Sequence, residues 1–151
     1  YMPNWCIGTL RVRGTKENLT NFVLEGLSPV TYMGQELEPL KMDDYGCIEC
    51  ERCWIKGTHR GFVVDSNVYF DVLKDEEETT IALDTEFAWS ISTEELLNSC
   101  KKYGVDMRIY AFERGMQFNQ IIEIIDGKIT KDEEVEFDDY DWDCICPNIG
   151  G

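Results

Sequence analysis

The pattern of hydrophobic and polar positions predicts a strand followed by a helix at the start of the chain. Over residues 5–13, apolar side chains alternate with polar ones such as Arg11 and Arg13, and a period of two is typical of a half-buried strand. Over residues 15–24 the apolar spacing becomes three and four, with Thr15 placed to cap the first turn, which predicts a short amphipathic helix.

The second half of the chain carries a clearer local pattern. Ser92 and Glu95 form a capping box ahead of an apolar stripe, and Gly104 follows as a stop, so a second helix is expected between them. Alternating residues then run over 105–112 and again over 118–125. The turn between these two segments predicts a β-hairpin.

The middle of the chain predicts a long excursion followed by strands. Residues 28–46 hold scattered Pro, Gly and polar positions, whereas 53–70 and 79–83 are rich in β-branched and aromatic residues. Together the elements predict an α+β fold, a ferredoxin-like sandwich with a mainly antiparallel sheet and two helices on one face. The expected domain covers residues 2–130, and an acidic C-terminal segment covers 131–151.

Length and composition favour one domain. The chain has 151 residues, a mass of 17.5 kDa and 43% hydrophobic residues, which suffices for one core. Met2 follows Tyr1 and is the expected native start. No run approaches the ~20 apolar residues of a membrane-spanning helix, and no signal peptide is evident, so we expect a soluble protein of the bacterial cytoplasm.

Charge narrows the choice of partner. Thirty Asp and Glu residues oppose 14 Lys and Arg residues, for a net charge of -16. Residues 131–143 carry a net charge of -7, so the remainder still carries -9. Such a surface repels nucleic acid and anionic membrane and favours a basic protein surface.

The acidic segment is the predicted partner-binding site, because aromatic residues interrupt its carboxylates. A nucleic-acid mimic presents carboxylates to a basic groove, and aromatic side chains anchor the contact. The alternative is a solvated, solubilising tail. The candidate residues are Glu133, Glu134, Glu136, Phe137, Asp138, Asp139, Tyr140, Asp141, Trp142 and Asp143. The same negative face is extended by Asp43, Asp44, Glu49 and Glu51 if the long loop lies nearby.

A cysteine cluster provides a second hypothesis, a zinc- or thiol-based regulatory module. Cys47, Cys50 and Cys53 are spaced by three, with His59 six residues later, and thiolate and imidazole are ligands that zinc prefers. A structural zinc site is one outcome. An iron–sulfur cluster completed by Cys146 is another. Free thiols are the third and are favoured, because seven cysteines without a secretion signal indicate a reducing compartment.

The remaining cysteines are expected to have structural or incidental roles. Cys6 and Cys100 fall on apolar faces and are predicted to pack in the core. Cys144 and Cys146 either join a metal site, form a reversible disulfide or are incidental.

Other candidate chemistry is sparse. Arg11 and Arg13, with Tyr110 and Phe112 on a later strand, form a possible basic–aromatic sheet surface for RNA, although pairing with nearby acids is the expected outcome. His59 is the only histidine, which excludes a catalytic triad and a two-histidine metal centre. An enzyme is therefore the least favoured class.

Short motifs resemble one known family. The opening Pro3-Asn4-Trp5-Cys6, followed by a strand ending in Gly14, resembles the YubB-type ferredoxin-like domain proteins of plasmids and phages. Weaker similarity is carried by Gly57-Thr58, by Thr85 with Trp89, and by Glu113, Gly115 and Phe118. The family's Trp-Gly-Thr-Lys-Trp is eroded here, and the acidic segment lies outside the pattern.

This resemblance implies a phage or mobile-element protein and no catalytic residues. Combined with the charge, it favours an acidic, non-enzymatic inhibitor of a host defence nuclease, of the anti-CRISPR or anti-restriction kind. Such an inhibitor occupies the nuclease's basic nucleic-acid-binding surface.

Overall fold

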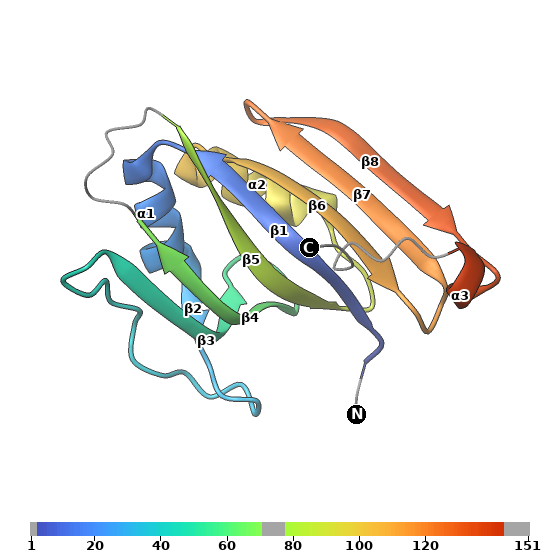
Figure 1. The fold of residues 1–151 in the computed structure, drawn as a ribbon, viewed down its shortest axis with the longest axis horizontal. Coiled ribbons are helices and arrows are strands. Elements are labelled where there is room, and N and C mark those ends of the chain that lie inside the picture. The colour runs from blue at the N-terminus through green and yellow to red at the C-terminus, as the bar shows by residue number, and fades with distance from the viewer. Residues whose placement is uncertain (1–2, 71–77, 144–151) are drawn as a thin grey trace.

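A single antiparallel sheet organises the computed structural model, which describes residues 3–70 and 78–143 (Figure 1). The strand order is β2-β3-β4-β5-β1-β6-β7-β8. The elements, in chain order, are β1 Trp5–Gly14, α1 Lys16–Gly26, β2 Leu27–Pro29, β3 Cys47–Ile55, β4 Gly61–Tyr69, β5 Thr79–Ala88, α2 Thr93–Tyr103, β6 Asp106–Glu113, β7 Phe118–Ile125, β8 Lys128–Glu136 and α3 Tyr140–Asp143.

Helix caps form where the sequence predicts them. The Thr15 side chain accepts the N–H of Asn18 at the start of α1, and Ser92 accepts the N–H of Glu95 at the start of α2. Gly104 ends α2 in the left-handed conformation, with φ of 68°, which glycine adopts without steric cost. The first strand, both main helices and the β6–β7 hairpin are therefore confirmed.

The ferredoxin-like sandwich is wrong. That topology rests on split βαβ units, in which a helix joins parallel strands. Here β1 pairs antiparallel with both β5 and β6, and the strand after α1 is the three-residue β2 at the far edge of the sheet. Over residues 3–70 and 78–143 the protein forms one eight-stranded antiparallel sheet with three short helices.

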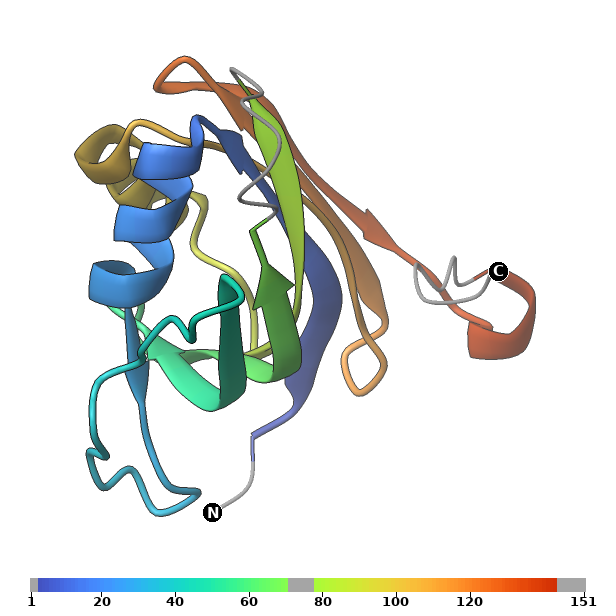
Figure 2. The same cartoon turned by 60° about the vertical axis from the view of Figure 1, so that its left-hand side comes forward.

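The hydrophobic core lies between the sheet and the two longer helices. Figure 2 shows α1 and α2 together on one face of the sheet. Leu19 and Phe22 of α1 and Leu96 of α2 are fully buried there against Leu10 and Ile109 of the sheet. Cys6 and Cys100 belong to the same core, as expected. The opposite face, which we call the open face, is the one that α1 and α2 leave uncovered in Figure 2.

Residues 131–136 of the acidic C-terminal segment belong to this sheet. The expected domain boundary after residue 130 falls inside β8, which pairs with β7 from Lys128 to Glu136. Strand β8 forms one edge of the sheet. Among the described helices, none combines the length and hydrophobicity that a membrane crossing requires.

Glu113 is a buried carboxylate that organises the β6–β7 turn. Its side chain is 1% exposed and accepts the N–H groups of Gly115 and Met116. Glu113→Gln is expected to lower the free energy of unfolding by about 1–3 kcal/mol, because an amide NH₂ replaces one acceptor and leaves a backbone N–H unsatisfied. Urea denaturation measures this loss. Glu25→Gln, at an exposed carboxylate, is the control, and equal losses in both variants would contradict the role of Glu113.

Candidate functional site

The acidic margin is the surface formed by β8, α3 and the residues joining them. Strand β8 is exposed along its whole length, since only one side of it is paired. Alternate residues of a strand point to opposite faces, so carboxylates project from both sides of this edge. The exposed carboxylates of the predicted site are Glu133, Glu134, Glu136, Asp138, Asp139, Asp141 and Asp143.

The margin is anchored to the domain along β8 and just after its end. Phe137 is buried, and its backbone N–H donates to the carbonyl of Gln117 at 2.9 Å. The Gln117 amide in turn donates to the carbonyl of Asp138 at 3.0 Å. Along β8, the Thr93 hydroxyl of α2 donates to Asp132 at 2.9 Å. Strand β8 and Phe137 therefore pack on the domain, a point that the sequence pattern left open.

Within α3, two of the acids serve the local fold. The Asp139 carboxylate accepts the N–H of Asp141 at 3.0 Å, and the Asp143 carboxylate accepts the N–H of Asp139 at 3.2 Å. Trp142 lies between them with its side chain 87% exposed. Within the predicted site, the exposed carboxylates that accept no hydrogen bond and form no salt bridge among the described residues are Glu133, Glu134, Glu136, Asp138 and Asp141.

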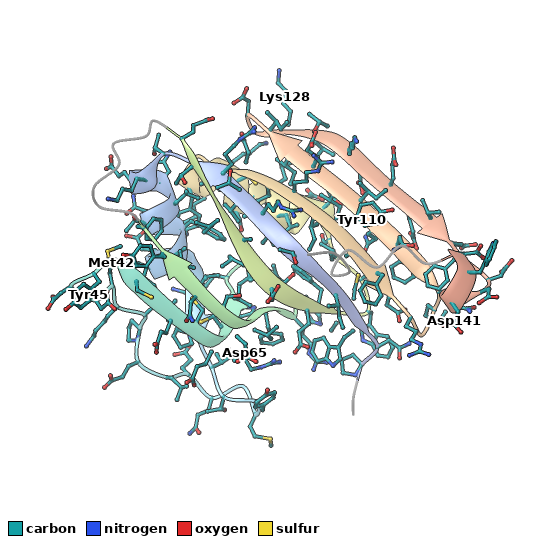
Figure 3. The ribbon with its side chains drawn as sticks, in the orientation of Figure 1. Met42, Tyr45, Asp65, Tyr110, Lys128 and Asp141 are labelled. Carbon is teal, nitrogen blue, oxygen red and sulfur yellow. The ribbon has the colours of Figure 1, made fainter. Side chains whose placement is uncertain are left out.

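Loop and β3 acids do not extend this margin. Asp43, Asp44, Glu49 and Glu51 lie on or before β3, which is next to the opposite edge of the sheet. Tyr45 and Asp141 mark these two ends in Figure 3. Asp43 also has a structural role, because its carboxylate accepts the N–H groups of Tyr45 and Cys47 at 2.8 and 2.9 Å.

The cysteine cluster is spread along β3. At about 3.3 Å per residue, six residues of strand separate Cys47 from Cys53 by roughly 20 Å, too far for two ligands of one zinc ion. His59 lies exposed in the following turn, where its backbone N–H donates to Glu95. No group of three or more His, Cys, Asp or Glu side chains able to hold a metal occurs within residues 3–70 and 78–143.

Two of these cysteines nevertheless share the core face. Cys50 and Cys53 are both buried, although residues three apart in a regular strand face opposite sides. The alternation in β4 also changes phase, at Asp65, whose φ is 47°. A hydrogen bond to Cys50, together with burial, raises the pKa of the Cys53 thiol. The same hydrogen bond lowers the pKa of the Cys50 thiol. Both thiols are core residues, while Cys144 and Cys146 lie outside the described residues.

The basic–aromatic sheet surface is largely neutralised. Arg11 and Arg13 share the open face with Tyr110 and Phe112, which lie on β6 beside β1. Arg13 forms a salt bridge with Asp106 at 3.0 Å. On β6 itself, Arg108 approaches Glu123 at 3.7 Å. Nearby acids therefore balance most of the positive charge that RNA would require.

An arginine–aromatic pocket on the open face is a feature that the sequence pattern did not reveal. Its side chains come from four strands, the β3–β4 turn and the long loop, and the register of the sheet brings them together. Phe62 of β4 is opposite Glu86 of β5, and Trp5 begins the neighbouring β1. The side chains that define the pocket are Trp5, Tyr32, Arg52, Arg60, Phe62 and Glu86.

Arg52 is the centre of that pocket. Its guanidinium carbon lies 4.2 Å from the ring centroid of Phe62 and 4.7 Å from that of Tyr32, and Nη1 contacts Glu86 at 2.6 Å. In the sequence, the available signal was the spacing of Arg52 and Trp54, which places both on one face of β3. This spacing does not indicate which residues of neighbouring strands lie beside Arg52.

Comparison with known proteins adds no relative. No protein-family model matches the chain, and neither a curated protein nor a solved structure matches it. Function is therefore inferred from the side chains described above.

Proposed function

We propose that this protein is a non-enzymatic binding protein whose acidic margin occupies the basic surface of a nucleic-acid-handling protein. The observation that carries this proposal is the exposure of Trp142, at 87%, beside the uncommitted carboxylate of Asp141 and just beyond the buried Phe137. An exposed tryptophan supplies the large apolar contact typical of interface hot spots, and surrounding charges steer the partner into place.

The anchoring of the margin favours binding over a solubilising role. A disordered acidic tail loses conformational entropy when it binds, whereas β8 is held by its pairing with β7 and Phe137 is already buried. The margin is therefore preorganised, which reduces the cost of association. Its carboxylates also protect the open edge of β8 from pairing with other strands.

The class of partner follows from charge and from the motif resemblance. A net charge of -16 disfavours direct binding to nucleic acid, so the complementary surface is a basic groove that normally holds nucleic acid. The similarity of the opening residues to a plasmid and phage family favours a host defence nuclease, either a CRISPR effector or a restriction enzyme. Inhibition would then be steric and electrostatic.

A displacement assay tests this proposal. Purified restriction nucleases and CRISPR effectors are loaded with fluorescent duplex DNA, and release by the protein is followed by anisotropy. Trp142→Ala is expected to weaken displacement about thirtyfold, the equivalent of about 2 kcal/mol for a central aromatic contact. Wild-type displacement is expected to weaken at least tenfold between about 50 and 200 mM salt.

A charge-matched pair of variants separates the margin from general acidity. The first neutralises Glu133, Asp138 and Asp141. It leaves intact Asp139 and Asp143, whose carboxylates accept backbone N–H groups around α3. The second neutralises the exposed helix residues Glu17, Glu25 and Glu94, with the same change in net charge. Only the first is expected to weaken displacement and its salt dependence. Equal effects of both triples, or salt-insensitive tight binding, would refute the role of the margin, and release of DNA from none of the nucleases would refute the proposed partner class.

A further inference from the structure

The arginine–aromatic pocket has the size and wall chemistry of a small-ligand site. Its volume is about 600 Å³, inside the range of about 300–1,000 Å³ common for such sites. Aromatic rings of Trp5 and Phe62 pack edge to face, with centroids 6.2 Å apart. The pocket is built from β1, β3, β4, β5, the β3–β4 turn and the long loop, whereas the acidic margin is built from β8 and α3.

One wall of the pocket is fixed by Arg52. Its side chain is only 11% exposed, held between two rings and paired with Glu86. Its Nε atom is buried without a hydrogen-bond partner in the described chain, an arrangement that costs stability. A buried charge pair with an unsatisfied donor is tolerated most readily at a functional site.

The second cation, Arg60, is available to a ligand. Its guanidinium carbon lies 5.7 Å from the centroid of the Trp5 ring. Among the described residues, Arg60 forms no salt bridge with a carboxylate. Because Arg52 is balanced by Glu86, the uncompensated charge of the pocket is positive, in a chain whose net charge is -16.

We infer that this pocket binds a nucleoside monophosphate whose base carries an exocyclic amino group. A phosphate matches the forked donors of Arg60, and a planar base stacks on the aromatic wall. The salt bridge uses one Glu86 oxygen, Oε1, which leaves the other to accept an amino group of adenine, cytosine or guanine.

The surroundings favour a single nucleotide over a strand of nucleic acid. A neighbouring hollow shares Tyr32 and Arg52 with the pocket and is lined by Glu38, Glu49 and Asp65. The successive phosphates of a strand running in that direction would be repelled by these carboxylates. Such repulsion between charges acts over roughly 8 Å in physiological salt. A monophosphate meets only the positive pocket.

Calorimetric titration of the full chain with AMP, CMP and UMP tests this inference. AMP and CMP are expected to bind with dissociation constants below about 1 mM, and UMP, which lacks the amino group, at least fivefold more weakly. Arg60→Gln is expected to weaken AMP binding at least tenfold, since it removes a charge-assisted hydrogen bond. Arg11→Gln, an equal charge change at an exposed arginine, is expected to stay within twofold of wild type.

Three further probes separate the sources of binding. Adenosine and inorganic phosphate are each expected to bind more weakly than AMP, because each offers one half of the contact. A short adenine oligonucleotide that binds more tightly than AMP would overturn the assignment to a single nucleotide. Absence of AMP binding, or AMP binding unaffected by Arg60→Gln, would overturn the site. None of these outcomes bears on the DNA-displacement assay or on the effect of Trp142→Ala in it. The nucleotide site and the role of the acidic margin therefore fail separately.

Discussion

Leu10→Ala is expected to lower the free energy of unfolding by about 2–5 kcal/mol, the range for removing a large buried aliphatic side chain. Leu10 is 0% exposed at the centre of β1, opposite Leu83 of β5 and Ile109 of β6. Because β1 pairs on both sides and the helices cover this face, neighbouring side chains have little freedom to close the cavity. Domains of this size are stable by about 5–15 kcal/mol, so the loss is a large part of the total.

Graded and matched variants keep this prediction measurable. Leu10→Val removes less volume and is expected to cost about 1 kcal/mol, which remains accessible if Leu10→Ala fails to fold. Arg11→Ala changes the next residue, on the open face, and is expected to stay within about 0.5 kcal/mol of wild type. Urea denaturation measures all three. A loss below about 1 kcal/mol for a folded Leu10→Ala would contradict the central place of Leu10.

The local elements were predictable because each depends on neighbouring residues. The alternation around Leu10 identifies β1, and the Ser92 cap with Gly104 at the other end identifies α2. These signals follow from the two periodicities and from the unsatisfied groups at helix ends. They determine what each segment becomes, but they do not determine which strands pair.

Strand pairing was the step that sequence reasoning missed. The order strand, helix, strands, helix, hairpin is compatible with a ferredoxin-like sandwich and with the observed antiparallel sheet, because both bury the same apolar faces. Long-range registers such as Leu10 with Leu83 decide between them. The same limitation hid the pocket around Arg52, whose walls Trp5, Phe62 and Glu86 are distant in sequence.

The C-terminal segment shows a second kind of limit. Acidic residues have low strand propensity, so the run around Glu133 and Glu134 suggested an appended tail. Among the interleaved aromatics, Phe137 was the correct signal of packing, since it is buried, whereas Trp142 is exposed. β7 is an ordered template along which β8 pairs from Lys128 to Glu136, and that pairing outweighs local propensity.

Alkaline pH is expected to destabilise the protein through two buried thiols. Burial raises the pKa of Cys6 to about 12, helped by the negative charges of Glu113 and Glu134. Burial likewise raises the pKa of Cys100 to about 12, with a contribution from Asp106. Their side chains are 0% and 2% exposed, so ionising either one in the folded state would place a charge in the core.

The direction of the effect follows from where protons are lost. Unfolded thiols ionise near pH 8.5–9, while the folded ones keep their protons until about pH 12. Unfolding therefore releases protons in this window, and stability falls as the pH rises through it. Below about pH 8 the contribution is fully present. At about pH 10.5 each thiol is expected to have lowered the free energy of unfolding by about 2 kcal/mol, or by about 4 kcal/mol for both.

Urea denaturation measures the contribution of the two thiols to this loss of stability. It is carried out at about pH 8 and pH 10.5, on the wild type and on the double variant Cys6→Ala with Cys100→Ala. The double variant starts from lower stability because it loses packing, so the comparison is between the two falls in stability and not between absolute values. Lysine, tyrosine and the remaining cysteines titrate in both proteins and cancel in this difference. The wild type is expected to fall by about 4 kcal/mol more than the double variant. Equal falls would mean that Cys6 and Cys100 ionise in the folded protein as readily as in the unfolded chain. That outcome would contradict their burial among Leu10, Val12 and Leu96.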